Sequence, residues 1–196
     1  MRLLHYLLVL PGALFFYVIF YVTARTVLPV LPPLPLWESA EFTVDLAGYT
    51  VQFFDLVFFA AGAVIFCHGV LYLAYVSSYP DSLYRMMADN RTDPARGPYR
   101  TVRHPLYSAF MMIELGIFSS LKSVYALLFI AFLFTVQTLS AFFEEQYLLK
   151  KRYRDRYTAY TTRVYRRFFT PFLVVYTLIM ALLSGGGIYM LFTGGV

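Results

Sequence analysis

Four long apolar tracts dominate this sequence and leave few folds open to it. They cover residues 3–28, 50–76, 105–143 and 168–192. A helix needs about 20 mostly apolar residues to cross a hydrocarbon core about 30 Å thick, and each tract is at least that long. Backbone groups find no water inside a bilayer, so such tracts cross it as helices. The sequence therefore predicts an all-α integral membrane protein.

The third tract is too long for a single span. It is interrupted at Ser119–Ser123 (SSLKS), which predicts a tight helical hairpin. The last tract contains glycines at 185–187, which are typical of either a helix break or a close-packing surface. About five transmembrane helices follow, in a single membrane domain covering residues 1–196. Residues 1–78 would form two spans with an external linker, 79–170 the core with the hairpin, and 171–196 the last span.

The segment between the first two tracts, residues 28–41, is rich in proline. Proline lacks an N–H group and clashes with the preceding helical turn, so this segment cannot form a regular helix. We predict an external linker, with Trp37 lying in the membrane interface, where tryptophan is enriched.

Basic residues are distributed asymmetrically along the chain. Of the 16 lysines and arginines, only Arg25 and Lys122 lie outside Arg2, residues 77–103 and residues 144–167. Five spans place these three regions on one side of the membrane. Because loops on the cytoplasmic side are enriched in Lys and Arg, we predict a cytoplasmic N-terminus and an external C-terminus. The net charge of +5 then reflects topology, and we expect no nucleic-acid partner.

Composition supports a membrane protein and argues against two kinds of site. Hydrophobic residues make up 60% of the chain and charged residues 14%, whereas soluble domains have about half and a quarter. The single cysteine, Cys67, excludes a disulfide framework. The three histidines, His5, His68 and His104, lack the spacing of a metal-binding motif, so no metal site is predicted.

The second basic segment, residues 144–167, predicts an amphipathic helix. Tyr153, Tyr157, Tyr160 and Val164 recur at helical spacing on one face. One interpretation is a helix on the membrane surface with its aromatic face toward the lipid. The tyrosine hydroxyls also leave open a binding role.

Two polar motifs flank the predicted hairpin. Arg103-His104-Pro105 precedes its first helix, and Glu144-Glu145 ends its second. Each has a simple structural interpretation, because proline suits the first turn of a helix and carboxylates are tolerated at a membrane interface. Alternatively, the two motifs bind a ligand together, since the predicted topology places them on one face of the membrane.

Two further carboxylates lie within predicted spans. Asp55 is close to the external end of its span and is most simply an interfacial residue. Glu114 lies deeper, where a carboxylate is rarely exposed to lipid. We expect Glu114 to line a cavity or to pair with His68 or Arg103.

The stretches GPYRTVRHPLY (97–107) and EEQYLLKKRYRDRYTAYTTRVYRR (144–167) together resemble the isoprenylcysteine carboxyl methyltransferase and phospholipid methyltransferase group. That group's pattern is G-x-Y-x-x-x-R-H-P-x-Y-x-G, followed after a hairpin by E-E-x-x-L and Y-x-x-Y-x-x-x-V-x-R. Ala109 stands in place of the last glycine of the first part. The matching residues are Gly97, Tyr99, Arg103, His104, Pro105, Tyr107, Glu144, Glu145, Leu148, Tyr157, Tyr160, Val164 and Arg166. Arg154 stands where the group commonly has a glycine. The resemblance covers about residues 85–170.

This resemblance implies an integral membrane enzyme that uses S-adenosylmethionine at the cytoplasmic face to methylate a lipidic acceptor arriving from the bilayer. The implied cofactor-binding residues are Tyr99, Arg103, His104, Pro105, Tyr107, Glu144, Tyr157 and Tyr160. The implied catalytic residues are His104, Glu144, Glu145 and Arg166. The membrane would be the cytoplasmic (inner) membrane, or the endoplasmic reticulum in a eukaryote.

The side-chain chemistry suits such a cofactor. Tyrosine faces attract a sulfonium cation, an arginine fork holds a carboxylate, and a glutamate pairs with an ammonium group. An amine acceptor must also lose a proton, which Glu144, Glu145 or His104 could accept. The acceptor stays open between a prenylcysteine, an aminophospholipid, an isoprenoid and a small thiol.

Two other functions remain possible. The first is an NADPH-binding enzyme resembling the sterol reductases, against which Pro105 argues because that family typically lacks proline after the histidine. The second is a non-catalytic membrane scaffold protein with the same helical layout.

Overall fold

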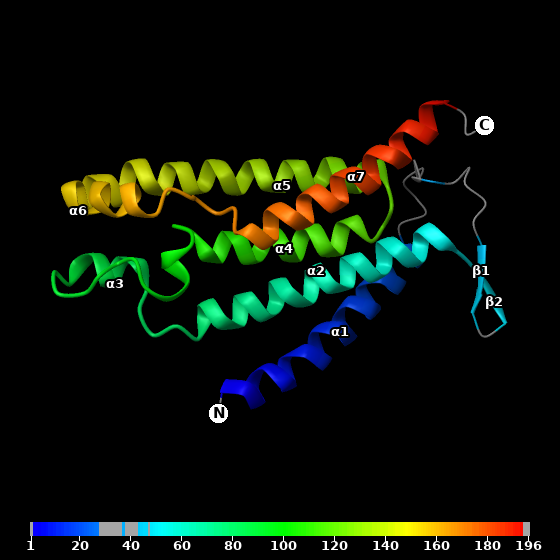
Figure 1. The fold of residues 1–196 in the computed structure, drawn as a ribbon, viewed down its shortest axis with the longest axis horizontal. Helices are drawn as coiled ribbons and strands as arrows, with labels where there is room; N and C mark the ends of the chain where they lie inside the picture. The colour runs from blue at the N-terminus through cyan, green and yellow to red at the C-terminus, as the bar shows by residue number, and fades with distance from the viewer. Residues whose placement is uncertain (1, 28–36, 38–42, 47, 194–196) are drawn as a thin grey trace.

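The computed structural model describes residues 2–27, 37, 43–46 and 48–193, and these residues are almost entirely helical (Figure 1). The helices are α1 (Arg2–Val27), α2 (Phe53–Ser77), α3 (Leu83–Ala88), α4 (Pro105–Ser119), α5 (Val124–Phe143), α6 (Lys150–Arg163) and α7 (Pro171–Thr193). Shorter elements are the 3₁₀ helix Gly97–Arg100, the π-helix Glu144–Leu149, and the strands β1 (Thr43–Leu46) and β2 (Tyr49–Gln52). The predicted all-α membrane fold is confirmed.

Among the described residues, four helices are long and apolar enough to cross a membrane. They are α1, α2, α7 and the helix that begins with α5 and continues to Arg163. The fifth predicted span, α4, is apolar but has only 15 residues, or about 22 Å. It is short because Pro105 begins it inside the protein and the turn at 120–123 ends it, as the predicted hairpin requires.

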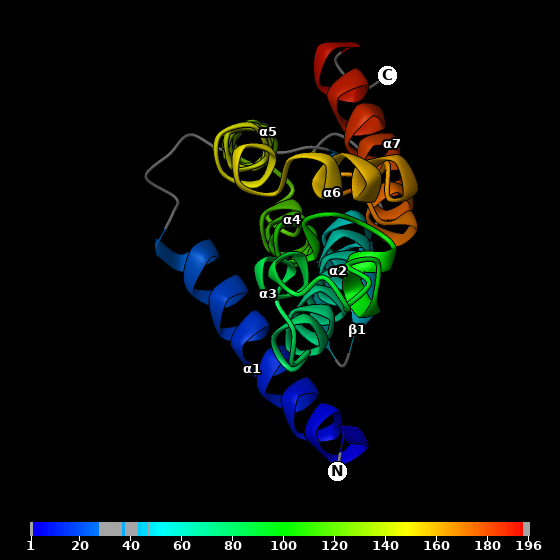
Figure 2. The same ribbon diagram turned by 90° about the vertical axis from the view of Figure 1, so that its left-hand side faces the viewer.

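Helix α4 lies at the centre of the bundle. It contacts α1, α2, α5 and α7, and Figure 2 shows these helices arranged around it. The main buried cluster joins α4, α2 and α7 through Met111, Leu115, Phe58, Leu173 and Met180. The short central helix α4 therefore connects the four described helices that surround it.

Glycines allow α2 and α4 to approach closely. A Cβ atom added to Gly116 of α4 would lie 2.5 Å from the backbone nitrogen of Phe66, and one added to Gly69 of α2 would lie 2.8 Å from that of Ile113. Small residues of this kind let helices pack backbone to backbone in a membrane, where the hydrophobic effect does not drive them together.

Trp37 bridges α2 and α7 at the end of the bundle opposite α6. Its indole N–H donates to the carbonyl of Leu183 at 2.8 Å, and its ring stacks on Phe54 with centroids 4.1 Å apart. A Cβ on Gly186 would lie 2.6 Å from this ring. Helix α7 is continuous through residues 185–187, so these glycines do not break the helix, and Gly186 provides the surface on which Trp37 packs. The rest of the predicted linker, residues 28–36 and 38–41, lies outside the described residues.

The strands β1 and β2 pair antiparallel at the same end, and the sequence analysis missed them. Asp55 is also more than an interfacial residue there. It forms ion pairs with Arg25 at 2.9 Å and with the buried Lys122, whose ammonium group also donates to Gln52. This network ties α1, α2 and the α4–α5 turn together.

Two intramembrane polar residues have partners that the sequence did not indicate. Glu114 accepts a hydrogen bond from Gln137 of α5 at 2.5 Å, so neither His68 nor Arg103 is its partner. His68 instead lies 2.8 Å from the hydroxyl of Tyr176 in α7. Both pairs link neighbouring helices within the apolar region.

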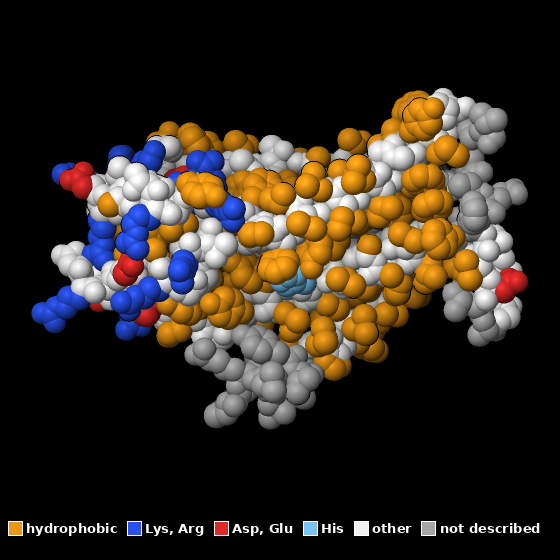
Figure 3. All heavy atoms as spheres, viewed as in Figure 1, with side chains coloured by type: hydrophobic (Ala, Val, Ile, Leu, Met, Phe, Trp, Pro, Cys, Tyr) orange, Lys and Arg blue, Asp and Glu red, His pale blue; other side chains and the backbone are white. Residues whose placement is uncertain are grey.

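The basic residues gather at the end of the bundle formed by α3 and α6, as Figure 3 shows. Residues 77–103 and 144–167 meet at this end, while β1 and β2 lie at the other (Figure 1). The charge asymmetry predicted from the sequence therefore corresponds to two opposite ends of the folded protein.

We predict that Gly116→Ala lowers the free energy of unfolding by about 2 kcal/mol, because the added Cβ forces α2 and α4 apart. Thermal unfolding in detergent measures the change. Gly185→Ala is the matched control, since a Cβ there meets no described atom within 4 Å. Equal effects of the two substitutions would contradict the proposed close packing.

Candidate functional site

The site lies at the basic end, where α4 begins and α6 leads into α7. The backbone N–H of Arg103 donates to the carbonyl of Arg166 at 3.0 Å, and that of His104 donates to Arg167 at 2.8 Å. These two bonds hold the Arg-His-Pro motif beside the segment that follows α6. Pro105 is buried at the first position of α4, as expected for a residue with fixed φ and no N–H.

His104 lies between the two predicted carboxylates. Its Nε2 is 3.0 Å from Glu145 Oε1, and its Nδ1 is 3.5 Å from Glu144 Oε2. Glu144 and Glu145 begin a π-helical turn, in which adjacent side chains are separated by a smaller angle than in an α-helix. The wider turn therefore lets two consecutive glutamates contact one imidazole.

Glu145 is the centre of a buried ion-pair cluster. Its side chain is 2% exposed and lies 3.4 Å from Arg103 Nε and 3.1 Å from an Arg167 terminal nitrogen. Burial alone would raise its pKa. The hydrogen bonds from His104 and Arg167 and the charge of Arg103 outweigh burial and lower the pKa to about 2. Glu145 is therefore ionised and fully engaged by protein groups.

Glu144 is more accessible than its neighbour. Its side chain is 23% exposed and accepts a hydrogen bond from Tyr84 of α3 at 2.7 Å. Burial, followed by this bond to a carboxylate, raises the pKa of Tyr84. Tyr107 also lies near Glu144, and its ring centroid lies 5.5 Å from that of His104. The geometry thus leaves Glu144 as the carboxylate that a ligand can reach.

The aromatic face of α6 packs against protein. Tyr157 and Tyr160 are 0% and 2% exposed and share a buried cluster with Leu83 and Met87 of α3. Tyr160 also donates to the carbonyl of the predicted site residue Tyr99, which is half-buried, at 3.0 Å. The interpretation of α6 as a helix lying with this face on lipid is therefore wrong.

A sharp kink at Arg154 turns α6 across the end of the bundle, from α5 toward α7 (Figure 2). Arg154 has φ 40° and ψ −117°, a conformation that glycine adopts freely and other residues adopt at a cost of about 1–3 kcal/mol. The group that the chain resembles commonly has a glycine here, and a glycine would adopt this conformation without that cost.

The two arginines after α6 have different surroundings. The guanidinium of Arg166 lies 5.4 Å from the ring centroid of Tyr165, while that of Arg167 binds Glu145. Sequence matching indicated Arg166 as a site residue, and the structure brings Arg167 to the carboxylate instead. Tyr84 was also missed, because α3 has six residues and no periodicity that would single it out.

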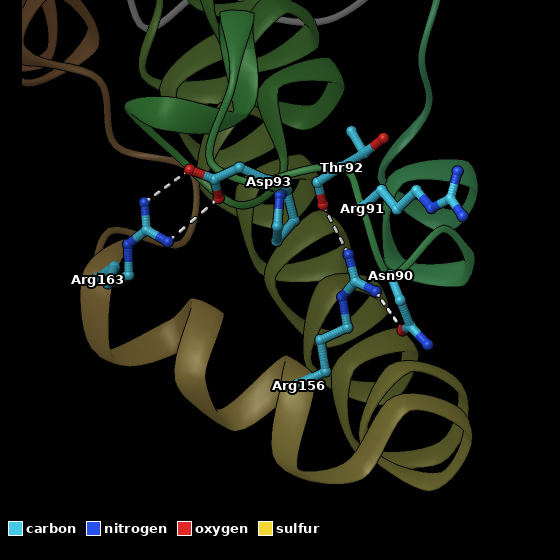
Figure 4. A pocket seen from close by; sticks show the side chains of 7 residues that line it. Asn90, Arg91, Thr92, Asp93, Arg156 and Arg163 are labelled. Carbon is cyan, nitrogen blue, oxygen red and sulfur yellow. Dashed lines mark hydrogen bonds and ion pairs between the residues drawn. The ribbon is translucent and has the colours of Figure 1, made fainter.

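A hollow on the outer side of α6 is separate from this cluster (Figure 4). Arg156 donates to Asn90 and to the Thr92 carbonyl, both at 2.6 Å, and Arg163 forms a bidentate pair with Asp93. The bond from Arg163 lowers the pKa of Asp93. None of the predicted site residues lines the hollow, whose arginines Arg156 and Arg163 clamp residues 90–94 onto α6.

Comparison with known proteins gives one match. The model of a family described as phospholipid methyltransferases matches residues 52–156, which is more than half of the chain. The matched region runs from β2 into α6 and includes His104, Glu144 and Glu145. No curated protein and no solved structure matches the chain significantly.

We predict that the folded protein loses stability as the pH falls through the range from about 5 to 2. The lowered pKa of Glu145 stabilises the folded state above its ordinary value of 4.5, and that stabilisation, about 3 kcal/mol, disappears as the carboxylate is protonated. Thermal unfolding at a series of pH values measures it. Glu145→Gln should be less stable at neutral pH and should lack this loss, so parallel pH profiles would contradict the assignment.

Proposed function

The chain belongs to the phospholipid methyltransferase family, and on that basis we propose that it transfers a methyl group from S-adenosylmethionine to a lipid at the cytoplasmic face of a membrane. Methyl transfer to lipid-type acceptors follows from the family. The cofactor, the acceptor and the membrane face are our inference. The observation that supports it best is the accessible Glu144 beside His104, next to the ion pair of Glu145 with Arg103.

The residues at the site fit the amino-acid tail of this cofactor, which carries an ammonium and a carboxylate. Glu144 offers a carboxylate for the ammonium. Arg103 contacts Glu145 through Nε, and its terminal nitrogens have no hydrogen-bond partner among the described residues, so they can hold a carboxylate. Glu144 and Arg103 carry opposite charges and contact the same His104–Glu145 pair, so together they match the two ends of such a tail.

Tyrosines supply the rest of the binding surface. Tyr84, Tyr99 and Tyr107 are half-buried and lie around Glu144. Their rings can contact the adenine and attract the sulfonium, whose chemistry is to carry an activated methyl group. Tyr157 and Tyr160 act one layer below, where they hold α3 and Tyr99 in place.

The chain's own contribution to the reaction is positioning, exclusion of water and proton transfer. The helix α3 and its Tyr84 cover Glu144 and restrict water. A protonated amine acceptor must lose a proton, and Glu144 Oε2, 3.5 Å from His104 Nδ1, is placed to accept it. A carboxylate or thiolate acceptor would need no such base, so the accessible Glu144 favours an aminophospholipid.

Two alternatives lead to different binding results. A reductase resembling the sterol reductases would bind NADPH, and a scaffold protein would bind neither nucleotide. The family match favours the methyltransferase over both.

We predict that S-adenosylhomocysteine binds the purified protein in calorimetry and that NADPH does not. Glu144→Gln should weaken this binding at least about tenfold, because a charge-assisted hydrogen bond to the ammonium is lost. Asp155→Asn, at an exposed position of α6, is the control and should leave affinity unchanged. Unchanged affinity in Glu144→Gln would contradict the site, and no binding by folded wild-type protein would contradict the function. Transfer of labelled methyl groups into a membrane lipid extract would then identify the acceptor.

The proposed orientation places α6 in the cytoplasm and the β1–β2 hairpin outside. In a Cys67→Ala background, Tyr49→Cys should react with a membrane-impermeant maleimide in intact cells, since Tyr49 is 76% exposed in β2. Asp155→Cys in α6 should react only after the membrane is opened. The opposite labelling pattern would place the site on the external face.

A further inference from the structure

A polar pair lies within the apolar part of the bundle, apart from the proposed cofactor site. His68 of α2 and Tyr176 of α7 are joined by the 2.8 Å contact between Nδ1 and the hydroxyl. Phe172, one turn earlier in α7, meets the His68 ring edge to face with centroids 4.8 Å apart. We call His68, Phe172 and Tyr176 the α2–α7 seam.

The seam reaches the surface that would face lipid. His68 is half-buried, while Phe172 and the nearby Val64 of α2 are 59% and 61% exposed. Figure 3 shows a histidine at the surface of this face among hydrophobic side chains.

The α2–α7 seam contains a hydrogen-bond donor that has no acceptor among the described residues. Among the described residues, neither His68 nor Tyr176 has another hydrogen-bond partner. We assign the tautomer in which the Tyr176 hydroxyl donates to Nδ1, which places the ring proton on Nε2. An N–H group facing hydrocarbon is costly without an acceptor. The seam therefore has one N–H donor that faces the lipid, and an oxygen atom of a lipid can accept its hydrogen bond.

The seam lies deeper in the bundle than the proposed site, because His68 is nine residues before the end of α2 at Ser77. Tyr176 is five residues, or about 8 Å, beyond the start of α7 at Pro171. That start is anchored beside α4, because Ser108 donates to the carbonyl of Phe168. Tyr107, which adjoins His104, and Tyr176 pack against the same buried cluster. Tyr72, one turn above His68 in α2, packs there as well and links the seam to the site.

We propose that the α2–α7 seam binds the acceptor lipid and that His68 Nε2–H donates to an acyl-ester carbonyl of a glycerophospholipid. This inference rests on the proposed function and names where its substrate lies. Ester carbonyls occur where headgroups meet acyl chains, deeper in the membrane than the headgroup amine. The acyl chains then lie against the exposed apolar residues of α2 and α7, and the headgroup amine extends upward past Tyr107 to Glu144.

The test compares a diacyl phosphatidylethanolamine with its dialkyl-ether analogue, which lacks both carbonyls. Delipidated protein in detergent is mixed with each lipid, and native mass spectrometry measures how much stays bound. Wild-type protein should prefer the ester lipid about tenfold, the effect of one buried hydrogen bond. His68→Phe should lose the preference, whereas His68→Gln, which keeps an N–H donor, should retain most of it.

S-adenosylhomocysteine binding should be the same in wild type and His68→Phe, which shows that the fold and the cofactor site are intact, whereas the thermal unfolding midpoint should fall slightly because the contact with Tyr176 is lost. An ester preference that is equal in wild type and His68→Phe, or that is absent in wild type, would overturn the inference. Lipid retention does not need methyl transfer. Ester preference without any transfer of labelled methyl groups would therefore contradict the proposed function and leave the lipid site standing.

Discussion

The basic end of this protein depends on one buried carboxylate. Glu145 binds Arg103 and His104, which precede α4, and Arg167, which precedes α7. A buried charge is tolerated only when its partners are in place, so this residue requires that three separate segments meet. Its neighbour Glu144 contacts His104 and Tyr84 instead. Glu145 joins the segments of the site, while Glu144 bonds Tyr84 and stays more accessible, with 23% of its side chain exposed.

Within the bilayer the helices are held by different means. Apolar side chains gain little by leaving lipid for one another, so close backbone contact and interhelical hydrogen bonds carry the association. Gly116 allows close backbone contact between α2 and α4. Interhelical hydrogen bonds join Gln137 to Glu114 and Trp37 to Leu183. The contact of His68 with Tyr176 belongs to the same class, with the difference that it leaves a donor toward the lipid.

The sequence predicted the spans, the hairpin and the meeting of the two polar motifs at one end. It did not predict which side chains would be accessible. Tyr157 and Tyr160 match a family pattern, yet they are packed beneath the site because the kink at Arg154 folds α6 onto α3. The family pattern matched Arg166, but Arg167 contacts Glu145. The path of the backbone after α6 decides which of these two adjacent side chains points inward.

The sequence by itself determined that this chain crosses a membrane and that its charged motifs share one end. Both conclusions follow from the length of apolar tracts and the count of basic residues, which are local quantities and need no knowledge of contacts. Only the tertiary structure decided how the two adjacent glutamates divide their roles. That division arises from a π-helical turn and from a hydrogen bond between His104 and Glu145, 41 residues apart, which no local pattern records.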